Sequence, residues 1–308
     1  VRRQTIRIRK RLSGHITRLV RPLRSGPKQS IMTDEIKVAL GQMSSRWAEK
    51  EINLRRITAM TAQAADEGAD LIVFPEMALS GYRAKASFAE MRTLAEPIPG
   101  PATQALAAVA QAEDIAIAFG LPEVSGEDLY DAAVLLTGDD LHVYRKTHVH
   151  WTEYFTPGDA LPVWSTAFGQ VGMLICFDLS FSEPARVLAL GGAELILAPS
   201  AVPPDFDAHA QRRAAARALD NQLHVLYCNF AGPGFPGHSL VAGPEGELIA
   251  RASGEETLLF CSLDRRKLRA WREKERVFAM RRPELYTPIS RRHHNVQRRR
   301  EESTQKDP

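Results

Sequence analysis

A short apolar segment that ends on a cysteine is the feature that most constrains the fold of this chain. Residues 171–175 are Val-Gly-Met-Leu-Ile, Cys176 follows directly, and residues 182–184 (Ser-Glu-Pro) have the character of a helix start. An apolar run of this length that leads through a turn into a helix is typical of a buried strand in an α/β domain. At the edge of a sheet, the thiol would leave the core beside backbone N–H groups that are free to face a reacting oxygen.

Strand and helix patterns alternate along most of the chain. Strands are expected at about residues 36–42, 70–75, 115–119, 132–137, 141–146, 171–176, 194–198, 223–229, 238–242, 247–251 and 256–263. Helices are expected at about residues 47–67, 102–112, 183–190, 207–220 and from 264 onward. Crossovers mixed with hairpins predict an α/β fold with partly parallel, helix-covered sheets. The length of 308 residues allows one large domain, and no linker or repeat divides residues 34–290.

Basic residues are concentrated at the two ends of the chain. Residues 1–31 contain ten Lys and Arg and no acid, and residues 291–308 contain six against three. Residues 32–290 contain 24 basic and 34 acidic side chains, so the folded part is acidic although the whole chain has a net charge of +3. We expect a disordered basic extension at 1–31 outside the functional protein, one folded domain at 32–290, and a disordered basic tail at 291–308. An organelle transit peptide and a polybasic arm are the alternatives for the extension.

Composition excludes several classes of protein. The sequence has no apolar run of about 18 residues, so no membrane partner is expected. Its three cysteines (Cys176, Cys228 and Cys261) fit neither a disulfide framework nor a zinc site, which favours a reducing, cytoplasmic location. The acidic balance of the folded part argues against nucleic acid as a partner. No metal-ligand set, P-loop or G-x-G-x-x-G segment is present, so we expect no metal and no cofactor.

Two further apolar segments end on residues that could activate the cysteine. Residues 70–75 lead to Glu76, and residues 142–145 lead to Lys146. A free thiol is mostly neutral at pH 7 and is a poor nucleophile, so it needs a general base. We expect Glu76 to take the thiol proton and to deliver it later to the departing amine. Lys146 would favour the thiolate and the oxyanion, assisted by the Phe177 backbone N–H.

Each of these residues also has a simpler interpretation. A cysteine at the end of a buried strand is usually a small core residue, and Cys228 and Cys261 take that interpretation. A glutamate after Phe-Pro is usually a solvated loop residue, and a lysine at a hairpin end is usually a surface charge. The catalytic hypothesis rests on all three residue types ending apolar strands within one α/β pattern.

The residues that follow Lys146 leave two questions open. Glu153, seven residues further on, could hold the ammonium or orient a substrate amide, or it could be a surface charge. His148 and His150 suggest a Cys–His pair as an alternative, but that pair would leave Glu76 and Lys146 without a role.

Several ordered motifs resemble those of the carbon–nitrogen hydrolase (nitrilase) superfamily. They are Phe74-Pro75-Glu76 with Ser80-Gly81-Tyr82, Tyr144-Arg145-Lys146-Thr147-His148, residues 172–178 (Gly-Met-Leu-Ile-Cys-Phe-Asp), and Pro199-Ser200-Ala201. The resemblance covers about residues 36–290 and implies a four-layer αββα sandwich that pairs into homodimers or larger homo-oligomers. It implies Glu76, Lys146 and Cys176 as catalytic residues, with Glu153 as a fourth member. Phe177, Tyr82 and Ser200 are the candidates for oxyanion and substrate binding.

The residues after the cysteine favour one branch of this superfamily. Phe177-Asp178 is similar to the amidase-type branches, whereas nitrilases more often have Trp-Glu in these positions. We therefore expect cofactor-independent hydrolysis of a small linear carboxamide to a carboxylate and ammonia, with water and a small-molecule amide as substrates. An N-carbamoyl amine hydrolase acting on a ureido substrate is the alternative, followed by a nitrilase or a non-catalytic binding protein. Loops at 82–95, 150–160 and 202–208 are expected to shape the pocket.

Overall fold

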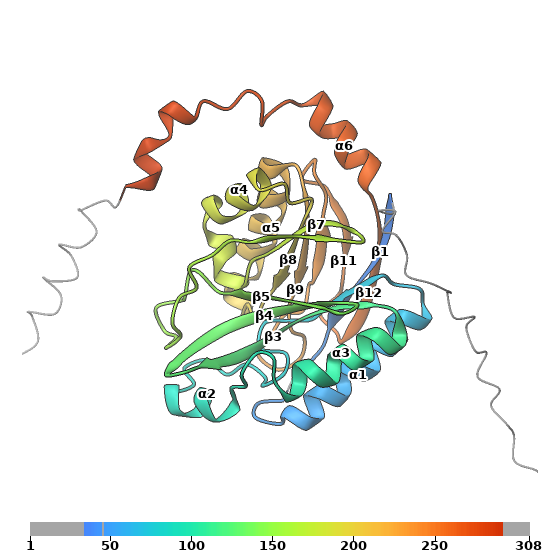
Figure 1. The fold of residues 1–308 in the computed structure, drawn as a ribbon, viewed down its shortest axis with the longest axis vertical. Coiled ribbons are helices and arrows are strands. Elements are labelled where there is room, and N and C mark those ends of the chain that lie inside the picture. The colour runs from blue at the N-terminus through green and yellow to red at the C-terminus, as the bar shows by residue number, and fades with distance from the viewer. Residues whose placement is uncertain (1–33, 45, 292–308) are drawn as a thin grey trace, which may run out of the picture. The chain divides into compact units, whose positions relative to one another are not determined.

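The computed structural model describes residues 34–44 and 46–291, which form a four-layer αββα sandwich. Two six-stranded sheets lie between helices α1 and α3 on one side and helices α4 and α5 on the other (Figure 1). The predicted extension at 1–31 lies outside the described residues, and so does the predicted tail at 291–308 apart from Arg291. None of the helices in the described part of the chain is long and apolar enough to cross a membrane.

The first sheet has the strand order β12-β1-β2-β3-β4-β5. Its strands are β1 (Glu35–Gln42), β2 (Leu71–Val73), β3 (Ala116–Ser125), β4 (Asp128–Thr137), β5 (Asp140–Arg145) and β12 (Thr257–Asp264). Strands β1, β2 and β3 are parallel, and β3, β4 and β5 form an antiparallel meander. The parallel strands therefore direct their carboxyl ends toward one edge, where loops can bring functional side chains together.

The second sheet has the strand order β11-β10-β9-β8-β7-β6. Its strands are β6 (Val163–Thr166), β7 (Gly169–Met173), β8 (Leu195–Pro199), β9 (His224–Cys228), β10 (Leu240–Ala242) and β11 (Leu248–Arg251). Strands β7, β8 and β9 are parallel and are connected through helices, so this sheet has the same mixed character as the first.

Four helices cover the outer faces of the two sheets: α1 (Lys50–Asp66) and α3 (Pro101–Glu113) on the first, and α4 (Ser182–Leu190) and α5 (Asp207–Asn221) on the second. Helix α2 (Phe88–Leu94) lies near β3, and α6 (Arg265–Lys274) leads away from the sandwich after β12 (Figure 1). Short 3₁₀ turns are η1 (Cys176–Ser180), η2 (Pro204–Phe206), η3 (Pro283–Leu285) and η4 (Thr287–Ser290). Helix α3 begins at Pro101. Proline is favourable in the first turn of a helix, because a backbone N–H in that position has no partner within the helix and proline has none to leave unpaired.

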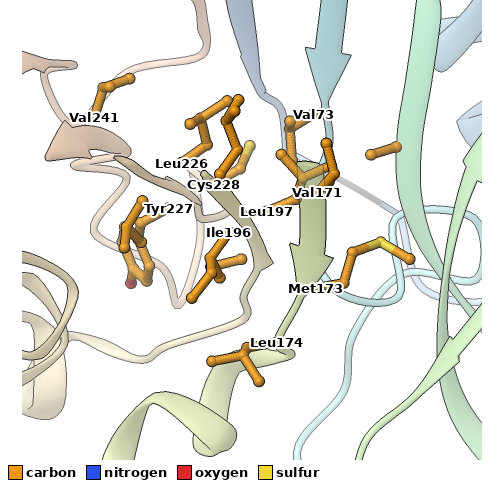
Figure 2. Packing of buried hydrophobic residues seen from close by; sticks show 14 of the residues in the cluster. Val73, Val171, Met173, Leu174, Ile196, Leu197, Leu226, Tyr227, Cys228 and Val241 are labelled. Carbon is orange, nitrogen blue, oxygen red and sulfur yellow. The ribbon is translucent and has the colours of Figure 1, made fainter. Parts of the chain in front are cut away.

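Alternating side chains divide the core of the first sheet between its two faces. In β2, Val73 belongs to the cluster between the sheets, whereas Ile72 belongs to the cluster under α1 and α3. Figure 2 shows Val73 together with Val171 and Leu197, which come from strands of the second sheet. The period of two along each strand thus supplies apolar groups to both layers of packing.

Three elements differ from the sequence-based expectation. Strand β3 continues to Ser125 and forms a long hairpin with β4, because Gly126 in the left-handed region (φ +62°) allows a tight turn. Strand β6 was not predicted, since its four residues are too few for a periodic pattern to be recognised. Helix α2 lies in the predicted loop at 82–95, where Ser87 and Glu90 form a capping box that the sequence contains.

Close backbone approach fixes the segment that follows β2. A Cβ atom at Gly120 in β3 would lie 2.5 Å from the Met77 backbone nitrogen and 2.7 Å from the Glu76 Cα. Only glycine allows β3 to pass this close to residues 76 and 77. The position of Glu76 is therefore set by main-chain packing against the neighbouring strand.

We expect Gly120→Ala to destabilise the protein by about 1–3 kcal/mol, because the new methyl group must displace backbone atoms and not a flexible side chain. Thermal denaturation would measure the loss. Gly254→Ala is the milder comparison, because the added Cβ would meet a single atom, the Pro236 oxygen, at 3.2 Å, a tight contact that a shift of a few tenths of an ångström relieves. Equal melting temperatures for the two variants would contradict the packing argument.

Candidate active site

Cys176 lies on a strained turn between β7 and α4. It is the first residue of η1, is half-buried, and has a backbone φ of +45°, which is uncommon for a residue other than glycine. Met77, directly after Glu76, also has a positive φ of +53°. Such strain costs about 1–3 kcal/mol per residue and concentrates at functional sites. Both unusual conformations here lie at or next to a residue that the sequence predicts to be catalytic.

Asp178 holds the cysteine turn in place. Its buried carboxylate accepts hydrogen bonds from the Ile175 backbone N–H (2.9 Å) and from the Tyr144 hydroxyl (2.8 Å). It also accepts from the His148 backbone N–H (2.8 Å) and the Thr147 hydroxyl (2.9 Å), and contacts His148 Nδ1 at 2.9 Å. One side chain thus joins the turn after β7 in the second sheet to the end of β5 in the first.

Lys146 lies at the end of β5, and its ammonium is surrounded by three carboxylates. Its Nζ atom lies 2.7 Å from Glu76 Oε1, 3.0 Å from Asp131 Oδ2, and 3.0 Å and 3.3 Å from the two oxygens of Glu153. Lys146, Glu76 and Asp131 are each at most 1% exposed. We call Lys146, Glu76, Asp131 and Glu153 the carboxylate–lysine cluster. The structure thus brings together three of the predicted catalytic residues and adds Asp131.

Asp131 was missed from the sequence, although the hairpin contains the signal. In the β4–β5 register Ala132 is paired with Arg145, so Asp131 is the next residue opposite Lys146. The Lys146 backbone N–H donates to the Asp131 carbonyl oxygen at 2.8 Å. Side chains of directly opposed residues lie on one face of a sheet, which brings the carboxylate to the ammonium.

Glu153 is held by its own loop and by Tyr82. The Tyr82 hydroxyl donates to Glu153 Oε1 at 3.2 Å, and the His150 backbone N–H donates to Oε2 at 3.2 Å. Tyr82 and Glu153 also line a cavity of about 30 Å³ between the loops at 82–95 and 150–160. Glu153 is therefore not a free surface charge, and Tyr82 has an orienting contact with it.

Opposing effects act on the pKa values of Lys146 and Cys176. Burial lowers the pKa of Lys146, but attraction to Glu76, Asp131 and Glu153 outweighs it and raises this pKa well above its ordinary value. Burial and the charge of Glu76 raise the pKa of the Cys176 thiol, although Lys146 and the Ala201 backbone N–H lower it. Together these effects raise the pKa of Cys176 well above its ordinary value, so the resting thiol is neutral. A neutral thiol makes a nearby base necessary, even though Lys146 favours the thiolate as expected.

Two other predicted site residues, Ser200 and Phe177, lie near the cysteine in sequence or through a neighbouring residue. The hydroxyl of Ser200 donates to the Ala198 carbonyl oxygen (3.1 Å) at the end of β8, while the next residue, Ala201, donates its N–H to the thiol. The ring of Phe177 lies edge-on to His150 and Trp151. Its backbone N–H is in the first turn of η1, where amides have no partner within the helix. Substrate contacts of Ser200 and Phe177 stay predictions.

The two histidines are used in other contacts. His148 is bound to Asp178 and stacks on Phe181 with ring centroids 4.0 Å apart. His150 stacks on Trp151 at 3.8 Å. These contacts favour structural roles over a Cys–His pair. Cys228 and Cys261 are buried free thiols in β9 and β12, as predicted.

The three carboxylates of the carboxylate–lysine cluster are close enough together to be considered as ligands of a metal ion. One oxygen from each of Glu76, Asp131 and Glu153 lies within 4.8 Å of the others. Oxygen donors of this kind suit hard divalent cations. However, Lys146 Nζ lies within 3.0 Å of each of the three carboxylates. The ammonium thus occupies the position that a metal ion would take.

Comparison with known proteins identifies the class to which this fold and site belong. The family model of carbon-nitrogen hydrolases matches residues 37–273, and the chain belongs to this family. Its similarity to amidases places it in the amidase-type branch of the nitrilase superfamily. It is an enzyme that acts on non-peptide carbon–nitrogen bonds.

Three similar proteins illustrate this relationship. The chain is 40% identical over 270 residues to "Hydrolase in pqqF 5′ region" of Pseudomonas protegens, covering 83% of this chain and 93% of that protein. It is 33% identical over 285 residues to citrullinase of Francisella tularensis, covering 84% and 99%. A solved variant of an amidase from Nesterenkonia sp. is 27% identical, with a TM-score of 0.70 and coverage of 82% and 95%. That structure is described as having the acetamide moiety of fluoroacetamide covalently added at its active site cysteine.

We expect Asp178→Ala to lower both stability and activity. The change leaves the buried N–H groups of Ile175 and His148 without an acceptor, and an unsatisfied buried donor costs about 1–3 kcal/mol. Asp178→Asn keeps one carbonyl oxygen and should be intermediate. Thermal melting and turnover measure the effects, with Asp66→Asn on the exposed face of α1 as the matched control. An Asp178→Ala enzyme as stable and active as the control would refute the role of the contact.

Proposed function

We propose that this enzyme hydrolyses a small linear carboxamide to a carboxylate and ammonia through an acyl-thioester on Cys176. One observation carries the proposal: Lys146 and Glu76 form a buried pair, with Nζ and Oε1 2.7 Å apart, and both charges act on the thiol. This is the combination of base, cation and nucleophile that the reaction requires. Water is the only co-substrate that the steps below need.

The first half of the proposed reaction forms the acyl-enzyme. Cys176 Sγ attacks the amide carbonyl carbon as Glu76 takes the thiol proton, which gives a tetrahedral oxyanion. The three N–H donors of Lys146 already face carboxylates, so its main contribution to the oxyanion is its positive charge. The Phe177 backbone N–H supplies a hydrogen bond. Glu76 then gives the proton to the leaving nitrogen, the C–N bond breaks, and ammonia departs.

The second half of the reaction releases the acid. Water attacks the thioester carbonyl while Glu76 accepts a proton from it, and the C–S bond breaks. The thiolate of Cys176 takes this proton from Glu76, and the carboxylic acid leaves and loses its remaining proton to the solvent. The raised pKa of the thiol favours the proton transfer from Glu76, since it returns Cys176 to its neutral resting form.

The relatives support this chemistry and one alternative. A covalent adduct on the active site cysteine of the Nesterenkonia amidase supports a cysteine nucleophile here. The similarity to a protein named citrullinase favours the alternative, an N-carbamoyl amine hydrolase that acts on a ureido group. Both reactions begin with attack on a carbonyl carbon that bears nitrogen, so the same three side chains would serve either one.

A homodimer or larger homo-oligomer is proposed as well. Val187 and Leu190 of α4 and Leu219 of α5 are each between 45% and 49% exposed on the outer helical layer. Apolar side chains on one outer layer are a surface that a second copy could bury. Sedimentation velocity at several protein concentrations would measure the oligomeric state.

We expect Cys176→Ala to remove turnover by several orders of magnitude without loss of the fold, because no other nucleophile can form the thioester. Glu76→Gln should cause a loss of similar size, since the two residues act together. Ammonia release from a panel of short aliphatic amides measures the effect, and circular dichroism monitors the fold. Cys261→Ala, at a buried thiol in β12, is the control and should retain activity. Full turnover by Cys176→Ala would refute the proposal.

A second assay distinguishes the amide from the ureido substrate. The wild-type enzyme is expected to release ammonia from simple amides, with no carbon dioxide. An N-carbamoyl amine hydrolase would release both ammonia and carbon dioxide, and only from ureido compounds. The second outcome would replace the amidase assignment but keep Cys176 as the nucleophile.

A further inference from the structure

The carboxylate–lysine cluster contains one carboxylate more than the proposed reaction uses. Asp131 is 1% exposed, and its Oδ2 atom lies 3.0 Å from Lys146 Nζ. In the proposed reaction Glu76 is the base and Glu153 helps to hold the ammonium, which leaves Asp131 without a role. A buried ionisable group in direct contact with a catalytic lysine is a candidate for a functional residue.

Charge makes full ionisation of this cluster unfavourable. The charged groups that act on Asp131 are Lys146 at the end of β5, Glu76 after β2, and Glu153 in the loop after β5. Three carboxylates and one ammonium would have a net charge of −2 in a buried site, beside the neutral thiol of Cys176. Like charges that share a site do not all ionise, so one carboxylate retains a proton.

The unpartnered oxygens indicate where this proton lies. Among the described residues, Glu76 Oε2 and Asp131 Oδ1 are buried side-chain atoms without a hydrogen-bond partner. Ionised carboxylate oxygens only accept hydrogen bonds, so neither can satisfy the other. The carboxyl groups of Asp131 and Glu76 lie within hydrogen-bond reach of each other, so a single proton on one of them makes it a donor to the other. Buried polar atoms without a partner are rare in folded proteins, which favours this arrangement.

We propose that Asp131 and Glu76 share one proton in the resting enzyme, held mainly as the carboxylic acid of Asp131, and that Asp131 is a positioning residue for Glu76. The acid donates its hydrogen bond to the Glu76 carboxylate and fixes the orientation of the base beside Lys146. Its role in turnover rests on the proposed function, whereas the shared proton does not. The raised pKa of Asp131 agrees, with burial as the main cause, charge repulsion by Glu76 and Glu153 in addition, and Lys146 opposing.

This arrangement has a defined pH dependence. The active form needs one proton on the Glu76–Asp131 pair. A second proton, taken up by the pair at low pH, leaves no carboxylate in the pair to act as base. Loss of the shared proton at high pH removes the hydrogen bond and adds a negative charge next to the thiol. We therefore expect kcat/KM to fall at both low and high pH, which gives a bell-shaped profile. The two apparent pKa values of this profile belong to the pair and not to either residue alone.

Infrared difference spectroscopy of the whole protein tests the shared proton without a substrate. The wild-type protein at neutral pH is expected to have the C=O stretching band of a protonated carboxylic acid. Asp131→Asn should lose this band. Glu76→Gln should lose this band as well. With the negative charge of Glu76 removed, the ammonium of Lys146 favours the ionised form of Asp131, which has no acid C=O band. The matched control is Glu123→Gln, at a buried carboxylate paired with Arg145 (2.6 Å), which should keep the acid band.

Two outcomes of the spectroscopy would overturn the proposal. One is the absence of the acid band from the wild-type protein. The other is its persistence in Asp131→Asn or, if that variant does not fold, in Glu76→Gln. Either result would place the proton elsewhere or remove it.

Kinetics test the positioning role separately, with an amide that the wild-type enzyme hydrolyses. In Asp131→Asn the alkaline limb of kcat/KM should disappear or move by more than about one pH unit, because an amide has no proton to lose. A merely structural role would lower kcat/KM equally at every pH, and that result would overturn the positioning role. If the wild-type enzyme hydrolyses no amide at all, the proposed function fails while the infrared result still decides the shared proton.

Discussion

The ammonium of Lys146 is the charge on which the rest of the site depends. Glu76, Asp131 and Glu153 come from three separate segments, and each lies within 3.0 Å of Lys146 Nζ. Without a cation among them, buried carboxylates this close together would repel one another and lose hydration that nothing replaces. Lys146 is therefore as much a condition for the folded arrangement as a participant in the proposed chemistry.

The site exists only when both sheets are in place. The carboxylate–lysine cluster is attached to the first sheet, and Cys176 is attached to the second. Asp178 connects the two through hydrogen bonds to the cysteine turn and to the residues after Lys146. Gly120 sets the backbone next to Glu76 by allowing close contact between strands. Contacts within the core thus fix the relative positions of base, cation and nucleophile.

Residues at the ends of apolar strands could be predicted from the sequence, because an interruption of the apolar pattern is visible there. This applies to Glu76, Lys146 and Cys176, although β2 and β7 end at Val73 and Met173, three residues before the glutamate and the cysteine. The alternation of strands and helices predicts helix-covered sheets, whereas the four-layer arrangement came from the family resemblance. Asp131 and Asp178 could not be recognised in the same way. Asp131 depends on the pairing of two strands, and Asp178 depends on Tyr144 and His148 as well as on its own turn. Their roles arise from tertiary contacts, which single-segment patterns do not contain.

The excess of carboxylates over cations in the carboxylate–lysine cluster affects which molecules bind at the site and which are released from it. With one shared proton, the carboxylate–lysine cluster keeps a net charge of −1 next to the nucleophile. A neutral amide can approach this charge without penalty, whereas an anion experiences repulsion that a desolvated cleft strengthens. The enzyme would thus accept uncharged reactants and release the acid that it makes, so that inhibition by the carboxylate product is weak.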